Sequence, residues 1–536
     1  MRSRYTPGNP VAESKAGVRT TPAAAIFVAV FFFAIAILLF SVAMRGIDHD
    51  EDHYMLGARF FADHVIYRDY LYQQPPFHPA LLGSVYELFA ERGLCKNPCY
   101  AFLARLLNWF FAVGVIAIFY LTLRTMFEQR LAIVGCTLLT FTSSFYHGAS
   151  VVRNDLMPLL LSLLAVYVLM RPLEAKASRR RRALVAGICA LGAVGTKLNY
   201  IHVPPALFLF LALWPPDMKW GERLREQVIP FSIGALIGLA SIALFAAPDP
   251  ALFYFGVFQS HSNPPPQWLA ARLPGNYPHQ MLADTLMRTP TSVLIVLSTF
   301  LILLIGLDRP PGRPLAYFYG NGQWLFFLIL VAGIAVCLLP APSYKWYFIP
   351  IAPFLILCFA SLWSYPTRNG LVHSAVLAIA VLACIPNFID IASKHLTRTF
   401  NPPKWRPVKV HAASVRLDEI LDAMDVRGKI ATLSPSRIID TKRDFYPELA
   451  SAWAFFPRAA FMPDADVRRL HGASPATLAS ILEADMPAAI FGGYEKNDGD
   501  DALFAFAEAH GYRRVEDEAL GRGILFVRQP QASTDP

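Results

Sequence analysis

The stretch Gly46-Ile-Asp-His-Asp-Glu-Asp-His53 places four carboxylates and two histidines directly after an apolar run that ends at about Met44. The run from Ala23 to Met44 is long enough to cross a hydrocarbon core of about 30 Å as one helix. Charged groups this close to a membrane surface are costly unless they bind a ligand, a metal ion or a proton. The stretch therefore predicts a site at the outer end of the first transmembrane helix.

The composition is typical of a protein that crosses the membrane several times. Of its 536 residues, 55% are hydrophobic, 13% are aromatic and only 16% are charged, which is unlike a soluble enzyme. The formal net charge is +9, but Arg and Lys cluster in short loops, as the positive-inside bias of membrane proteins requires. No basic stripe with interleaved aromatic residues occurs, so we expect no nucleic-acid partner.

Ten further apolar runs come near bilayer length, so we expect an all-α polytopic domain of about 11 transmembrane helices over residues 23–390. Residues 1–22 are predicted to form a cytoplasmic arm. The later helices are predicted at 99–123, 131–147, 156–171, 183–200, 201–214, 228–247, 291–307, 323–340, 345–363 and 371–389.

Basic loops set the orientation. The N-terminus, residues 124–130, the Arg171–Arg182 run and residues 217–227 should all be cytoplasmic. This holds only if Phe77–Ala90 does not cross the membrane, because one more crossing would put Arg179–Arg182 outside.

Residues 45–98 are therefore predicted to form one external loop with two helices that lie on or dip into the membrane. The first helix should be amphipathic, with Tyr54, Ala58, Phe61 and Val65 at helical spacing, and the second opens at Pro75-Pro76.

The pattern changes after about residue 390. Short apolar strands are predicted at 429–433, 488–491 and 524–527, and helices at 476–484 and 501–510, with Gly511 placed to end the last helix. Residues 391–536 should thus form a small external α/β domain. It contains none of the seven cysteines, so it is not a disulfide scaffold. Five cysteines fall in predicted helices as core residues, whereas Cys95 and Cys99 lie outside and could form a bridge.

This topology gathers charged residues at the outer face. A carboxylate there can act as a general base or a metal ligand, and a cation can hold the phosphate of a lipid carrier. The pattern therefore favours transfer chemistry on a lipid-phosphate substrate. The candidate acids are Asp48, Asp50, Glu51, Asp52 and Asp155, and the candidate phosphate ligands are Arg105, Arg153, Lys197 and Lys345.

Each candidate also has a structural interpretation. Asp155 is well placed to cap the helix that starts at Leu156, and Arg105 could pair with a loop acid or reach the headgroups. His49 and His53, with nearby aspartates, could ligate a metal ion. The sequence lacks His-Glu-x-x-His, which disfavours a zinc hydrolase.

The order of motifs resembles family 39 of the GT-C glycosyltransferases, which includes protein O-mannosyltransferases and lipid A aminoarabinose transferases. The resemblance covers most of residues 23–365. Its motifs are Asp50-Glu51-Asp-His-Tyr54, Ala58-Arg59, Tyr67-Arg-Asp-Tyr70, Gln74-Pro-Pro76, Arg105, Arg153-Asn-Asp155, Gly195-Thr-Lys197 and Tyr344-Lys345-Trp-Tyr-Phe-Ile-Pro350.

This resemblance implies an inverting transferase that takes a sugar from a polyprenyl-phosphate donor at the outer face of, we expect, a bacterial inner membrane, with the C-terminal domain periplasmic. The acceptor would be a lipid, glycan or protein hydroxyl. Asp50 matches the usual catalytic carboxylate and Asp155 matches a second acid of the active site, with Glu51 as a further candidate. A divalent cation assisting the phosphate stays open, with Asp50 and Asp155 as its candidate ligands.

One departure concerns the residues before the Pro-Pro pair. Many relatives have Lys or His there, whereas this chain has Gln73-Gln74, so an expected cation is missing. Gln74 itself, His53 or His78 could take part in its place. The outward loop 248–290, with His261–Pro266 and Trp268, has features of a proline-stiffened lid.

Two other functions use the same residues. In a transporter, the acids would couple ions or protons to a solute. Against this stand the large first loop, the missing hydropathy repeat and the external α/β domain. A catalytically silent relative that binds envelope partners is disfavoured by the retained Asp50 and Asp155.

The orientation is testable by cysteine labelling at Asn97 and Ser178. We expect the two positions to label from opposite sides of the membrane. All the basic loops are cytoplasmic only if the chain crosses the membrane an odd number of times between these two positions, as predicted here. Labelling of both from the same side would show that Phe77–Ala90 crosses.

Overall fold

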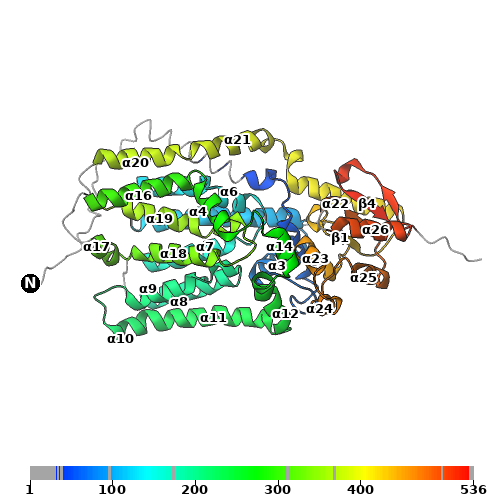
Figure 1. The fold of residues 1–536 in the computed structure, drawn as a ribbon, viewed down its shortest axis with the longest axis horizontal. Helices are drawn as coiled ribbons and strands as arrows, with labels where there is room; N and C mark the ends of the chain where they lie inside the picture. The colour runs from blue at the N-terminus through cyan, green and yellow to red at the C-terminus, as the bar shows by residue number, and fades with distance from the viewer. Residues whose placement is uncertain are drawn as a thin grey trace, which may run out of the picture.

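The computed structural model describes residues 32, 36, 40–94, 98–171, 176–307, 314–365, 370–495 and 499–529. A bundle of long helices occupies one end of the molecule, and a smaller unit with a β-sheet occupies the other (Figure 1). The predicted cytoplasmic arm lies outside the described residues, as does most of the predicted first transmembrane helix. Asn97 of the labelling experiment and Cys95 also lie outside them.

Each of the ten later apolar runs contains a helix. Four helical segments, 100–124, 220–246, 345–363 and 371–399, are long and apolar enough to cross a membrane alone, and a bent pair at 278–306 is a fifth candidate among the described residues. The number of 11 crossings stays a prediction. The helices are α4 (Tyr100–Arg124), α5 (Gln129–Phe141), α7 (Leu156–Met170), α8 (Lys176–Val194), α9 (Val203–Leu213), α11 (Ile229–Ala246), α16 (Thr291–Leu307), α18 (Trp324–Cys337), α19 (Ile351–Trp363) and α20 (Gly370–Leu382).

Three predicted transmembrane helices end early or break, and these breaks create the site. The run 131–147 divides at the extended residue Thr142 into α5 and α6 (Ser143–Ser150). Helix α8 ends at Val194 rather than near residue 200, and Lys197 has extended backbone. The run 345–363 begins with a short 3-10 turn, η4 (Lys345–Phe348), before α19. Non-helical backbone is tolerated at such depth where it is buried in protein or lines a cavity.

The first external loop contains the two predicted helices, α2 (Asp50–Phe60) and α3 (Phe77–Glu91). The prediction of an amphipathic surface helix was wrong for α2, because nine of its 11 residues are buried. It packs against α3, α4 and two C-terminal elements, η6 (Pro435–Arg437) and α23 (Ala452–Ala459). These C-terminal elements bury a helix that the sequence placed on the membrane surface.

The C-terminal part confirms the three predicted strands and adds a fourth. Its sheet has the order β1-β2-β4-β3, with β1 parallel to β2 and the other neighbours antiparallel. The missed edge strand carries two exposed arginines instead of an apolar run. The predicted helices are α25 (Leu478–Ala484) and α26 (Asp501–Ala509), and the strands are β1 (Ile430–Thr432), β2 (Ala489–Gly492), β3 (Arg513–Val515) and β4 (Ile524–Val527). Gly511 has φ +67° after α26, the left-handed conformation expected of a helix-ending glycine.

The cysteines follow the predicted division. Five are free and buried, namely Cys136, Cys189, Cys337, Cys358 and Cys384. Cys99 is disulfide-bonded, and its predicted partner Cys95 lies outside the described residues.

Polar contacts fasten the C-terminal part to the first external loop. Asp52 accepts hydrogen bonds from the backbone N–H of Ser436, at 2.9 Å, and from its hydroxyl. Arg59 donates to the carbonyls of Ile439 and Arg443 at 2.5 and 2.6 Å. One hydrophobic cluster also includes residues of both parts. The predicted division near residue 390 therefore does not separate two independent cores.

The buried Asp52 gives a pH prediction. Burial raises its pKa to about 7, against the lowering effect of the Ser436 hydrogen bonds and of Arg437. Between about pH 4 and 7 the folded protein then holds a proton that the unfolded chain releases, so the stability that Asp52 contributes falls as pH rises through this window. Asn cannot titrate. We expect the free energy of unfolding of the wild type, relative to Asp52→Asn, to decrease by about 1–4 kcal/mol from pH 4 to 7.

Denaturant unfolding of both proteins across this range measures that difference, in which the other titrating groups largely cancel. A relative stability that increases with pH would show instead that Asp52 is buried as a carboxylate.

Candidate active site

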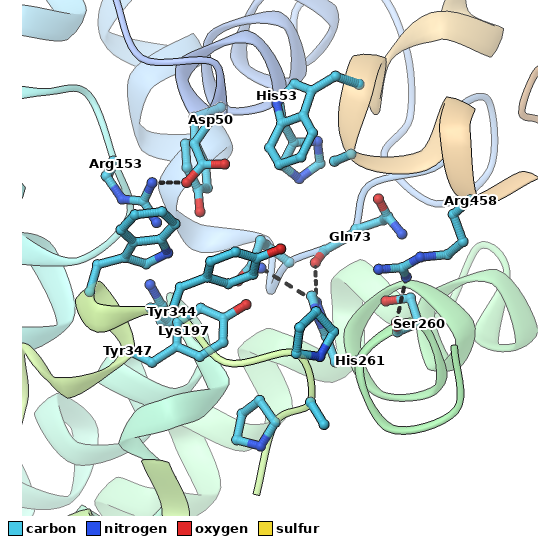
Figure 2. Close-up of a pocket in the computed structure, with 18 of the residues that line it drawn as sticks. Asp50, His53, Gln73, Arg153, Lys197, Ser260, His261, Tyr344, Tyr347 and Arg458 are labelled. Atoms are coloured by element: carbon cyan, nitrogen blue, oxygen red, sulfur yellow. Dashed lines mark hydrogen bonds and ion pairs between the residues drawn. The ribbon is translucent and has the colours of Figure 1, made fainter. Parts of the chain in front are cut away.

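A pocket opens where α2, the helix breaks and α23 meet (Figure 2). Its walls combine charged groups with aromatic rings and come from segments far apart in the sequence. The lining residues are Asp50, His53, Tyr54, Gln73, Gln74, Arg153, Lys197, Ser260, His261, Trp268, Pro340, Ala341, Pro342, Tyr344, Trp346, Tyr347, Trp453, Ala454 and Arg458.

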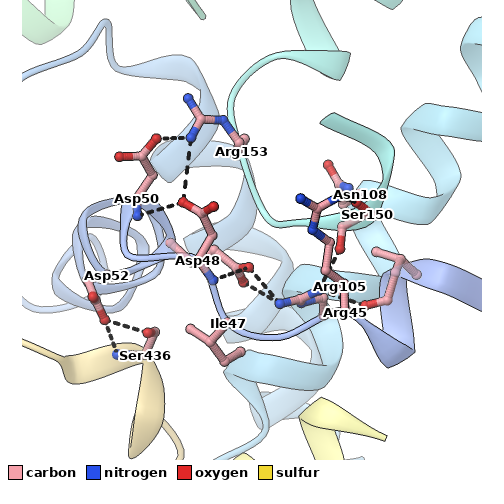
Figure 3. Close-up of polar contacts among 12 residues, drawn as sticks. Arg45, Ile47, Asp48, Asp50, Asp52, Arg105, Asn108, Ser150, Arg153 and Ser436 are labelled. Atoms are coloured by element: carbon pink, nitrogen blue, oxygen red, sulfur yellow. Dashed lines mark hydrogen bonds and ion pairs between the residues drawn. The ribbon is translucent and has the colours of Figure 1, made fainter. Parts of the chain in front are cut away.

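Asp50 begins α2 and faces this pocket, and its side chain is 13% exposed. Its backbone N–H donates to Asp48 at 3.1 Å, which helps to fix the start of the helix. Its carboxylate forms an ion pair with Arg153, as Figure 3 shows. The guanidinium of Arg153 also contacts Asp155 at 2.9 Å and lies 4.7 Å from the centre of the Trp346 ring. Arg153 is thus held in place by two carboxylates and an aromatic face.

Asp155 lies behind Arg153 and does not line the pocket. It forms a second ion pair with Lys197, and both side chains are buried. Although burial alone would raise the pKa of Asp155, Lys197 and Arg153 together hold it below its ordinary value. Burial lowers the pKa of Lys197, against the raising effect of Asp155. The side chain of Asp155 makes no hydrogen bond that caps α7, so the interpretation of Asp155 as a helix cap is not supported.

Glu51 and Arg105 pair with each other instead of facing the pocket. Arg105 donates to both carboxylate oxygens at 2.6 and 2.7 Å, and also to the carbonyls of Val42 and Ser150. Both side chains are almost fully buried. Burial raises the pKa of Glu51 to about 7, although Arg105 opposes this. The pair joins α2 to α4, and we assign it a structural role rather than catalysis or phosphate binding.

Lys345 also does not line the pocket. Its ammonium group lies 3.8 Å from Asp284 of α15 (Pro278–Met287), and its side chain is half exposed. Its neighbours Tyr344, Trp346 and Tyr347 line the pocket instead. The structure thus places Lys345 in a half-exposed ion pair outside this pocket, and its phosphate role stays a prediction.

The histidines proposed to replace the missing cation are neutral at physiological pH. Burial lowers the pKa of His53 to about 3 and that of His78 to about 4. The His53 ring stacks on Tyr72 with centroids 4.3 Å apart, and His78 does not line the pocket. Gln74 does line it, and its amide approaches His261 at 3.4 Å and Asn154 at 3.1 Å. Neither histidine thus supplies a positive charge.

Candidate metal ligands lie at the edge of the pocket. Within the described parts of the chain, Asp48, His49 and Asp50 have ligand atoms within 4.8 Å of one another, a donor set that suits a divalent cation. The predicted combination of Asp50 with Asp155 is less suited, because Arg153 lies between these carboxylates and pairs with both.

Two further segments complete the pocket wall. Ser260 and His261 belong to α13 (Ser260–Ser262) and Trp268 to α14 (Pro266–Arg272), in the loop whose His261 and Trp268 the sequence singled out as a lid. The sequence did not single out the second segment. Trp453 and Arg458 come from α23 in the C-terminal part. No local pattern marks these two residues, because only the docking of α23 on α2 brings them to the pocket.

Comparisons with known proteins agree with the resemblance seen in the sequence. Residues 73–246, about a third of the chain, match the family model of dolichyl-phosphate-mannose-protein mannosyltransferases. A comparison with curated proteins finds no match. The long apolar helices support an integral membrane protein.

Two solved structures resemble the whole chain. ArnT from Cupriavidus metallidurans in the apo state has a TM-score of 0.62 at 13% identity, covering 94% of this chain and 98% of that one. The same ArnT bound to undecaprenyl phosphate has a TM-score of 0.58 at 14% identity, covering 94% of this chain and 97% of that one. At these identities the likeness establishes a shared fold.

The structural role of Arg105 is testable by stability. Arg105→Ala leaves the Glu51 carboxylate buried without its partner, which should cost about 3–5 kcal/mol of unfolding free energy. Replacing both residues together, Arg105→Met with Glu51→Leu, should recover most of the loss, because no charge is then stranded. Lys345→Ala serves as the exposed control and should change stability by less than about 0.5 kcal/mol.

Unfolding in detergent, followed by tryptophan fluorescence, measures all three variants. If Arg105→Ala kept its stability but lost donor binding, the phosphate role predicted from the sequence would be right.

Proposed function

We propose that the protein transfers a sugar from a polyprenyl-phosphate donor to an acceptor hydroxyl at the outer face of the membrane, with Asp50 as the general base. One observation carries this proposal. Among the described residues that line the pocket, Asp50 supplies the carboxylate and pairs with Arg153, and Lys197 lines the same pocket. An attacking hydroxyl needs a base, and a departing phosphate needs positive charge.

The transfer step uses these groups as follows. Asp50 accepts the proton of the acceptor hydroxyl while the hydroxyl oxygen bonds to the anomeric carbon. The bond from that carbon to the phosphate oxygen breaks, and the phosphate leaves with the electron pair, so the configuration inverts. The ion pair with Arg153 favours the ionised form of Asp50, the form that can accept a proton. Lys197 supplies charge beside the leaving group.

The aromatic wall suits the rest of the donor. Tyr54, Trp346 and Tyr347 line the pocket beside the charged groups, and aromatic faces provide apolar contact area with few conformations to restrict. ArnT was solved with undecaprenyl phosphate, which supports a polyprenyl phosphate as the lipid carrier here. We place the enzyme in a bacterial inner membrane, with residues 391–536 on the periplasmic side.

The transporter alternative gains no support. The closely paired Asp155 and Lys197 are buried behind Arg153, and α23 of the C-terminal part forms one wall of the pocket. A substrate pocket built partly outside the transmembrane helices fits transfer to an external acceptor better than passage through the bundle.

The decisive substitution is Asp50→Asn, which keeps the size of the side chain but removes the basic carboxylate. We expect kcat for sugar transfer to fall by a factor on the order of 10²–10⁴, the range for loss of a general base, while donor binding persists. Asp52→Asn is the control, since Asp52 lies in the same first turn of α2, does not line the pocket and is bonded to Ser436 instead. It should reduce transfer by less than about tenfold.

The assay uses purified full-length protein with a labelled polyprenyl-phosphate sugar. Near-normal transfer by folded Asp50→Asn would remove Asp50 as the base. If the wild type consumed no donor but transported a solute in liposomes, the transporter alternative would be favoured.

A further inference from the structure

Each cation that lines the pocket has a carboxylate partner except one. Arg153 pairs with Asp50 and Asp155 and lies 3.9 Å from Asp48. Lys197 pairs with Asp155. Arg458 also lines the pocket, but within the described part of the chain it has no ion pair with a carboxylate. It is therefore the cation of the pocket wall that is left without a carboxylate partner among the described residues.

Arg458 is held in a conformation that faces the pocket. Its guanidinium donates to the carbonyl of Ser260 and lies 4.5 Å from the centre of the Trp268 ring. The residue is only 8% exposed, and its Nε has no hydrogen-bond partner among the described atoms. Figure 2 shows the guanidinium directed from α23 toward His261. A buried cation with unused donors is costly unless a ligand satisfies it.

The backbone of α23 is fixed against the first external loop. The hydroxyl of Ser451 donates to the carbonyl of Leu71 at 2.9 Å, and the Trp453 indole donates to the carbonyl of His49 at 2.6 Å. Arg458 is thus positioned by contacts with the same loop that carries Asp50. This rigidity favours a role in binding over a mobile surface charge.

A chain of contacts joins Arg458 to Gln74 along the pocket wall. The Gln74 amide approaches His261 at 3.4 Å. His261 follows Ser260, whose carbonyl accepts from Arg458. Burial lowers the pKa of His261 to about 4, with Arg458 and Lys197 adding to the effect, so the histidine is neutral. A positive charge in this part of the pocket wall is therefore supplied by Arg458, from a distant segment of the chain.

We propose that Arg458 binds a phosphate group of a substrate in this pocket, so that the C-terminal part contributes directly to substrate binding. The proposal rests on the proposed function in taking the phosphate to come from the lipid donor. An acceptor that carries a phosphate is the other source of the same chemistry. A planar guanidinium with free N–H groups is well suited to phosphate oxygens.

The test uses the full-length protein in detergent and three variants. Arg458→Gln removes the charge, Arg458→Lys keeps it without the planar donors, and Arg443→Gln is the control. Arg443 is a largely buried arginine of the same C-terminal part, paired with Asp422 and away from the pocket. The probes are undecaprenyl phosphate, undecaprenol and inorganic phosphate. Quenching of tryptophan fluorescence reports binding, because three tryptophans line the pocket.

We expect Arg458→Gln to weaken undecaprenyl phosphate binding by about 10–100-fold, the range for a lost hydrogen bond to a charged group. Arg458→Lys should be intermediate, and the Arg443→Gln control should stay within about twofold. Undecaprenol, which lacks the phosphate, should bind all four proteins alike. Thermal unfolding checks that each variant is folded. If Arg458→Gln does not fold, the comparison of Arg458→Lys with the wild type decides the test.

The remaining outcomes separate the sources and the two proposals. Unchanged undecaprenyl phosphate binding with weaker inorganic phosphate binding would support Arg458 as the ligand of an acceptor phosphate. Unchanged binding of both probes by the folded variants would overturn the proposal. If the wild type itself did not bind undecaprenyl phosphate, the proposed donor would be wrong, and the inorganic phosphate titration would still decide the role of Arg458.

Discussion

The buried guanidinium of Arg153 is the group on which the arrangement of the site depends. It lies between Asp50 and Asp155, and Lys197 completes a row of alternating charges. Each of these ions would be strongly destabilising in a low-dielectric interior without its neighbours. The row therefore fixes the start of α2, the turn before α7 and the end of α8 relative to one another. It also holds the Asp50 carboxylate at the wall of the pocket.

The helix breaks provide the space for this row. Continuous helices through 131–147 and 183–200 would satisfy all their own backbone groups but leave no non-helical segment at the outer end. Because α6 ends at Ser150 and α8 ends at Val194, Asp155 and Lys197 meet outside these helices, Asp155 just before α7 and Lys197 in extended backbone. The exposed backbone groups find other partners: Tyr200 donates to the carbonyl of Asp155, and the N–H of Phe77 donates to the carbonyl of Gly195.

The C-terminal part closes the site. Its contacts through Asp52 and Arg59 hold it on α2, which explains why a helix with three acids in its first turn is buried. The same docking brings Trp453 and Arg458 to the pocket wall. A unit that resembles an appended domain in the sequence is thus part of the substrate pocket, and its loss would expose α2 as well as open the cavity.

The sequence by itself determined the helical membrane class, the segments that form helices and strands, and Asp50 as a pocket residue. These follow from local patterns, since apolar run length and alternation are set within a few residues. It did not determine that Glu51 and Arg105 neutralise each other, that Lys345 turns toward Asp284, or that Arg458 faces the pocket. Whether a charged side chain is paired or free depends on which distant charge packs beside it. That pairing is decided only in the tertiary structure, because a buried charge must find its partner across the fold.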